Sequence, residues 1–75
     1  MGEIDLSIIK AIQKFTDEEI TMDSNLVEDL AINSMNMLFI IAELEEIFKI
    51  KISSNDIDSF VCVSDISELI KNKIK

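Results

Sequence analysis

Apolar residues recur at helical spacing from the start of the chain. Ile4, Ile8, Ile12 and Phe15 form one stripe, and the positions opposite them are mostly polar. This period is typical of a helix that buries one face. We therefore predict an amphipathic helix over residues 3–15.

The next eighteen residues, 16–33, show no sustained period and predict a long connection. Thr16 followed by Glu19 matches a capping box, so we expect one extra helical turn there. A connection of this length is unusual inside a small domain, and functional loops are the common reason for one.

The clearest helical pattern follows and ends near Lys49. Leu38, Ile41 and Leu44 share one side and are predicted to face the core, whereas Phe39 lies on the opposite side. Ser34 stands directly before this pattern, and a serine there is a good N-cap, so we expect its hydroxyl to accept a bond from the first turn.

The last third of the chain predicts one short helix and one longer one. Ile50 and Ile52 alternate with lysines in what we interpret as an extended linker, residues 53–60 favour a short helix, and Ser64 is expected to cap the last helix. The prediction is one all-α domain over residues 1–75, a bundle of three main helices and one short helix, with the long loop between the first two. Its core should contain Phe15, Leu38, Ile41, Leu44, Phe48, Ile50, Ile66, Leu69 and Ile70.

The composition excludes several classes of function. The chain has no histidine, no arginine and a single cysteine. It therefore lacks an imidazole base, a Ser-His or Cys-His nucleophile pair and a cysteine-based zinc site. No apolar stretch approaches the length of a membrane span, and no signal segment is evident. We expect a cytoplasmic, monomeric protein that is not an enzyme, holds no metal and has no transmembrane segment.

The charge is strongly negative and unevenly placed. Fifteen acidic residues face seven lysines, which gives a net charge of −8; residues 16–33 carry −6 and residues 34–48 carry −3. Such a chain is poorly suited to bind nucleic-acid phosphates. The acids on either side of Ser34 are either a solvated surface or a docking face for basic partners, and both interpretations stay open.

The residues around Ser34 resemble a known family. Leu26-Val27-Glu28-Asp29-Leu30 leads into Asn33-Ser34-Met35, and a helix ending in Leu44-Glu45-Glu46-Ile47-Phe48 precedes an alternating Ile50-Lys51-Ile52. This run, followed by the Val63-Ser64-Asp65-Ile66 entry to the last helix, is similar to the acyl carrier protein family, which includes the peptidyl and D-alanyl carriers.

The resemblance implies a function for the serine. Ser34 would be the attachment point of a 4′-phosphopantetheine arm taken from coenzyme A, and the arm would carry acyl or aminoacyl groups as thioesters. The implied partners are a phosphopantetheinyl transferase, an acyl- or aminoacyl-loading enzyme, and transferases or condensing enzymes. A phosphodiester at the N-terminus of a helix meets its positive pole and free N–H groups, which agrees with this role.

The sequence also departs from the family pattern near the serine. Asn33 replaces the usual Asp, Met35 replaces Leu as in the D-alanyl carriers, and Asn36 and Phe39 stand where fatty-acid carriers usually have acids. These departures favour a specialised carrier over the housekeeping one. The residues expected to recognise partners are Asn33, Met35, Asn36, Phe39, Glu43 and Glu46.

Two other functions fit the same residues. An acidic helical interaction module, such as an inhibitor, would use Ser34 only as a cap, and a carrier fold without modification could act as a regulatory subunit. Met37 could be core filler or could line a cavity for an acyl chain.

Overall fold

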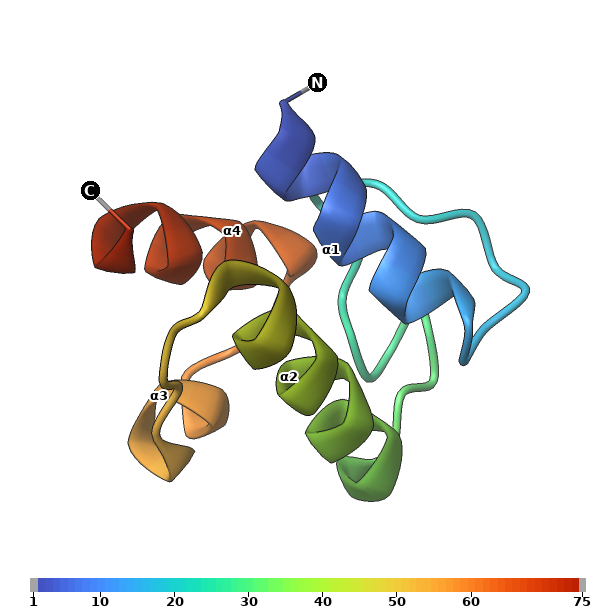
Figure 1. The fold of residues 1–75 in the computed structure, drawn as a ribbon. Helices are drawn as coiled ribbons and strands as arrows, with labels where there is room; N and C mark the ends of the chain where they lie inside the picture. Colours follow the sequence, from blue (N-terminus) through green and yellow to red (C-terminus); the bar gives the residue numbers. More distant parts are fainter. Residues whose placement is uncertain (1, 75) are drawn as a thin grey trace.

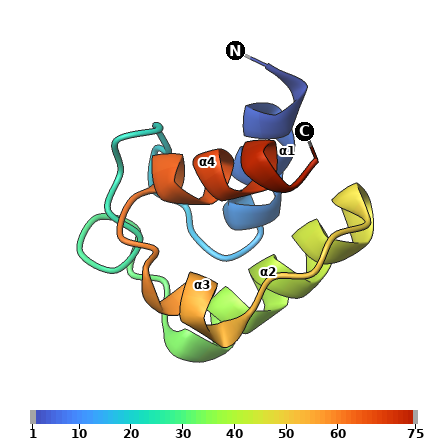
Figure 2. The same ribbon diagram turned by 90° about the vertical axis from the view of Figure 1, so that its left-hand side faces the viewer.

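The computed structural model describes residues 2–74, and within them it contains four helices. They are α1 (Glu3–Gln13), α2 (Ser34–Phe48), α3 (Ser54–Asp58) and α4 (Val63–Lys73). Helix α1 packs against both α2 and α4 (Figure 1). Figure 2 shows the short α3 between the start of α2 and α4. The predicted helical class, with three main helices, one short helix and a long first connection, is confirmed.

A continuous core of aliphatic side chains fills the space between the helices. The fully buried side chains that anchor it are Ile8, Ile12, Leu26, Leu30, Ile40, Leu44, Val63, Ile66 and Ile70. Phe15, Phe48, Ile50 and Leu69 pack against it while partly exposed. Of the predicted core, only Leu38 is wrong, because 60% of it is exposed.

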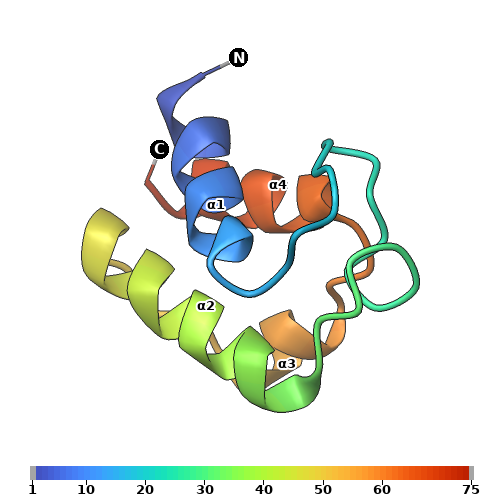
Figure 3. The same cartoon turned by 90° about the vertical axis from the view of Figure 1, so that its right-hand side faces the viewer.

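The connection from α1 to α2 is ordered by hydrogen bonds rather than by helical structure. The predicted helical turn at Thr16 is wrong: the Thr16 hydroxyl accepts from the N–H of Glu18, two residues on, so the chain bends there instead of starting a helix. Further along, the N–H of Leu26 donates to the carbonyl of Val61, and the N–H of Val63 donates to the carbonyl of Ser24. These bonds fix the loop beside the start of α4 (Figure 3).

Helix α4 begins one residue before the predicted cap. Its N-cap is Cys62 rather than Ser64, whose N–H already donates to the carbonyl of Met22 in the long connection. The Asp65 carboxylate accepts from the N–H groups of Cys62 at 3.0 Å and Val61 at 2.9 Å. These two bonds, with Cys62 first, hold the pKa of Asp65 below its ordinary value of 3.8.

Polar side-chain contacts join the two terminal helices in addition to their apolar packing. Ser67, which is buried on α4, donates its hydroxyl proton to the carboxylate of Asp5 on α1. The Lys71 ammonium lies 3.7 Å from the same carboxylate. Because the serine hydroxyl would otherwise be buried without a partner, this contact fixes how α4 lies across α1.

Candidate functional site

Ser34 occupies the first position of α2, and it does not cap the helix. The cap is Asn33, whose Oδ1 accepts from the N–H of Asn36 at 2.8 Å. The prediction that Ser34 is the N-cap is therefore wrong by one residue. Asparagine and serine cap about equally well, so the register could not be read from residue type. The exposed Ser34 hydroxyl is left free of a structural hydrogen bond among the described residues.

Beside Ser34 lies an open depression of about 360 Å³. Ser34 and Met37 contribute to its wall from α2, and Ile57 contributes from α3. The lining is completed by Val27, Ile32, Asn33, Leu38, Ser54, Asp58 and Phe60. Met37 is both a buried member of the core and part of the wall of this depression, so the two interpretations of its sequence position do not exclude each other.

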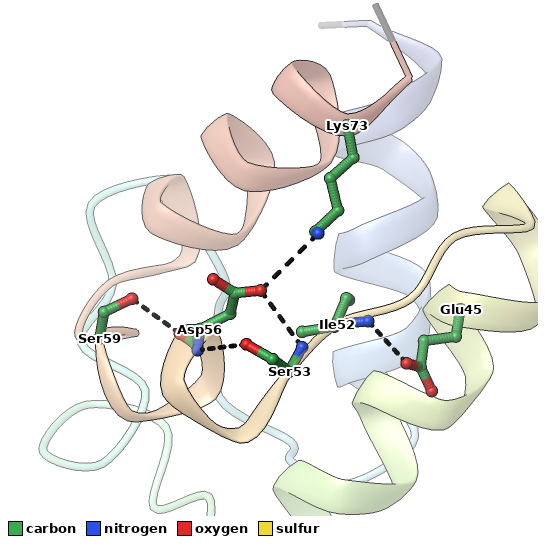
Figure 4. Close-up of polar contacts among 6 residues, drawn as sticks. All are labelled: Glu45, Ile52, Ser53, Asp56, Ser59 and Lys73. Carbon is green, nitrogen blue, oxygen red and sulfur yellow. Dashed lines mark hydrogen bonds and ion pairs between the residues drawn. The ribbon is translucent and has the colours of Figure 1, made fainter.

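Helix α3, one wall of this depression, buries none of its residues and is held by polar contacts (Figure 4). The Ser53 hydroxyl accepts from the N–H of Asp56 at 3.1 Å, and the Asp56 carboxylate accepts from the N–H of Ser53 at 3.2 Å. The Lys73 ammonium of α4 lies 3.8 Å from the same carboxylate. The hydrogen bonds from Ser53, and secondarily the charge of Lys73, hold the pKa of Asp56 below 3.8.

The linker into α3 is fixed by a residue of α2. The Glu45 carboxylate accepts from the N–H of Ile52 at 2.7 Å, as Figure 4 shows. Lys49 ends α2 in the left-handed conformation, with φ of 56°, and turns the chain back toward this bond. The Ile52 side chain is buried in this linker.

The outer side of α2 is apolar close to Ser34. Met35, Leu38 and Phe39 are 65%, 60% and 57% exposed, and no charged residue occurs between Ser34 and Glu43. The exposure of Phe39 is confirmed. Leu38 is not a core residue because Met37, Ile40, Ile41 and Leu44 already supply the buried side of the helix.

Besides Asn33 and Asn36, which form the cap, two of the six predicted recognition residues contact the residues that follow α1. The Phe39 ring stacks on the ring of Phe15, with centroids 6.1 Å apart and an interplanar angle of 4°. One helical turn later, the Glu43 carboxylate lies 2.7 Å from the Lys14 ammonium. The sequence did not predict that Lys14 and Phe15 belong to this surface. The spacing of apolar residues within one helix does not indicate which helix end lies beside α2.

The chemistry available at the site is that of one hydroxyl at the positive end of a fifteen-residue helix. Within residues 2–74, no three acidic or cysteine side chains come together as metal ligands. A free, exposed hydroxyl beside unpaired helix N–H groups suits a covalently attached phosphate, whose charge the helix end stabilises.

Comparison with known proteins decides the family. The family model described as "Phosphopantetheine attachment site" matches residues 6–70. The chain belongs to the acyl carrier protein family. An acyl carrier protein of Phytoplasma mali is 34% identical, with 89% of this chain and 88% of that protein covered. One from Borrelia garinii subsp. bavariensis is 37% identical, with 89% and 84% covered.

A solved structure agrees with this assignment. A Mycobacterium tuberculosis protein assigned as an acyl carrier protein superposes with a TM-score of 0.84 at 32% identity, covering 92% of this chain and 96% of that one. Acyl carrier proteins are carriers without catalytic activity, hold a covalent 4′-phosphopantetheine group and interact with biosynthetic enzymes. Between residues 2 and 74, this carrier has no helix with the length and apolarity that a membrane crossing needs.

Proposed function

We propose that Ser34 is the residue that carries the phosphopantetheine arm, and that the protein shuttles acyl or aminoacyl groups between partner enzymes. This is supported most directly by the different roles of Asn33 and Ser34 at the start of α2. Asn33 caps the helix at 2.8 Å, which leaves the exposed Ser34 hydroxyl available at the rim of the depression.

The residues of the site fit the group. The Ser34 oxygen would form the phosphoester bond, and the N–H groups of the first turn of α2 would stabilise the phosphate charge. When bound, the arm supplies a terminal thiol that holds the acyl group as a thioester. The chain contains no histidine to act as a base near neutral pH, so the attachment chemistry belongs to the transferase.

We further propose the partners and the setting. The partners are a phosphopantetheinyl transferase, an acyl- or aminoacyl-loading enzyme, and transferases or condensing enzymes, all meeting a monomeric carrier in the cytoplasm. The recognition surface comprises Asn33, Met35, Asn36, Phe39, Glu43 and Glu46. Because the first turns of α2 carry no acid, we favour a specialised pathway over housekeeping fatty-acid synthesis.

Intact-protein mass spectrometry tests the attachment site. The protein is incubated with coenzyme A and a promiscuous transferase, and the mass is expected to rise by one phosphopantetheine group. Ser34→Ala should abolish the gain, whereas Ser54→Ala, which removes a second hydroxyl lining the same depression, should retain it. A chain that gains no mass, or gains it equally in Ser34→Ala, would contradict the proposal and restore the unmodified interaction module as the better explanation.

A further inference from the structure

The residues that follow α1 contact the outer side of α2 at two neighbouring positions. Lys14 pairs with Glu43 at 2.7 Å, and Phe15 stacks on Phe39 with ring centroids 6.1 Å apart. Phe39 and Glu43 are four residues apart and therefore adjacent on one face of the helix. The end of α1 and this face of α2 thus form one surface.

The first of these contacts changes the charge of the surface. Helix α2 has three acids, and two of them are engaged: Glu43 by the Lys14 ammonium, and Glu45 by the N–H of Ile52. Of these three carboxylates, only that of Glu46 has neither an ion pair nor a hydrogen-bond partner among the described residues. A partner that relied on a basic patch would therefore find one free carboxylate on α2, and would have to compete with Lys14 for a second.

The second contact fixes an apolar side chain in place. Met35, Leu38, Phe39 and Ala42 are exposed and fall within about 100° of arc around the helix axis, at 100° per residue. Phe39 stays 57% exposed while its ring is held parallel to that of Phe15. A pre-oriented aromatic ring loses little rotamer freedom on binding, which favours it as a contact for another protein.

We propose that Lys14 and Phe15 determine which partners the carrier accepts, an inference that rests on the proposed carrier function. By neutralising Glu43 and holding Phe39, they select an enzyme whose docking face beside Ser34 is apolar, and they disfavour one whose docking face is basic. Lys14 acts through Glu43 and Phe15 through Phe39, so both are positioning residues rather than catalytic ones.

A matched pair of lysine variants tests the charge component. Lys14→Gln and Lys10→Gln each remove one positive charge, but Lys10, which is exposed on α1, takes part in none of the three ion pairs between described residues. The probe is a phosphopantetheinyl transferase with a basic docking face, and its dissociation constant is measured by titration calorimetry at low and high salt.

We expect Lys14→Gln to bind about threefold more tightly than Lys10→Gln at low salt, because the Glu43 carboxylate becomes available to the partner. The difference should vanish at high salt, where exposed charges are screened. The double variant Lys14→Gln/Glu43→Gln should lose the gain. Equal binding by the two single variants at low salt would overturn the proposal.

A second pair tests the apolar component with the transferase of the same organism as probe. Phe39→Ser should weaken binding about fivefold, whereas Ile47→Ser, at an apolar site that is 47% exposed about two turns farther from Ser34 along α2, should change it less than twofold. Equal effects would overturn the apolar contact. All binding is measured in a Ser34→Ala background, so it is independent of modification. A missing mass gain in the unmutated chain therefore contradicts the carrier site, and unchanged binding preferences contradict the role of the Lys14 and Phe15 contacts.

Discussion

The side-chain oxygen of Asn33 accepts a hydrogen bond from the N–H of Asn36 at 2.8 Å and so closes the first turn of α2. Asn33→Ala removes this acceptor, and we expect the free energy of unfolding to fall by about 1 kcal/mol. Urea denaturation followed by circular dichroism measures the change. Ser34→Ala should leave stability within about 0.5 kcal/mol, the range of ordinary surface substitutions.

Asn33→Asp is the matched control for this cap. Aspartate keeps the accepting oxygen and adds a negative charge at the positive pole of α2, so stability should be retained or slightly raised. If Ser34→Ala were as costly as Asn33→Ala, Ser34 would be the cap after all.

Ala31, three residues before Ser34, adopts a left-handed backbone conformation with φ of 54°. A side chain in this region is disfavoured by about 1–2 kcal/mol, whereas glycine adopts it freely. Ala31→Gly should therefore raise the free energy of unfolding by about 0.5–1 kcal/mol, after the greater freedom of glycine in the unfolded chain is counted. Thermal and urea unfolding measure the gain.

Ala42→Gly provides the opposite control. Ala42 is exposed in the interior of α2, where the helical conformation suits alanine better than glycine. The same substitution should lower stability there by about 1 kcal/mol. Destabilisation by both substitutions would show that the Ala31 conformation stores no removable strain.

The sequence predicted the elements well because their signals are local. The helical period identified α1 and α2, and the short helix expected within residues 53–60 is α3. The N-terminal boundaries were less well predicted. Asn33 and Ser34 are both good caps, and the start of α4 depends on bonds from Val63 and Ser64 to the distant long loop. Hydrogen bonds between segments far apart in the chain cannot be predicted from the local sequence.

The candidate site was only partly predictable for the same reason. Ser34 followed from the family resemblance, and the exposure of Phe39 followed from the helical period. Leu38 was misassigned because α2 is apolar on two sides, and periodicity alone does not say which side faces the core. The contacts of Lys14 and Phe15 with α2 depend on how α1 and α2 pack, which only the structure provides.

The bond from the N–H of Ile52 to the Glu45 carboxylate fixes the linker after α2. Glu45→Ala leaves this partly buried N–H without an acceptor, so stability should fall by about 1–3 kcal/mol. Glu45→Gln keeps an oxygen acceptor and should cost less. Glu46→Ala, an exposed neighbour that accepts no such bond, is the control and should stay within about 0.5 kcal/mol of the unmutated chain. Equal losses at both positions would contradict this role.

Phe39→Glu would place an acid where fatty-acid carriers usually have one. We expect the acylated variant to be turned over faster than the unmutated carrier by a fatty-acid-synthesis enzyme with a basic docking face, because the added charge complements that face. The gain should shrink as salt is raised. Steady-state turnover of the two acylated forms by one enzyme checks this, and equal or lower activity of the variant would count against it.

The Asp56 carboxylate links the stability of α3 to pH. Its pKa in the folded protein lies below the ordinary value of 3.8, first because the N–H of Ser53 donates to it. The unfolded chain therefore takes up this proton at a higher pH than the folded chain does. The stabilisation that the ionised Asp56 gives the folded protein is fully present above pH 3.8. It is lost as the pH falls through the lowered pKa of Asp56 in the folded protein.

Urea unfolding at neutral pH and at about pH 3 measures this effect, since the contribution lies in the acidic range. Asp56→Asn should show a smaller loss of stability on acidification than the unmutated chain. Asp58→Asn is the control: it removes an equal charge from the same helix, but Asp58 accepts none of the capping bonds. Both variants relieve the same general repulsion in this acidic protein, so the difference between them isolates the capping carboxylate. Identical acid sensitivity in the two variants would mean that the Ser53–Asp56 capping box does not couple α3 to pH.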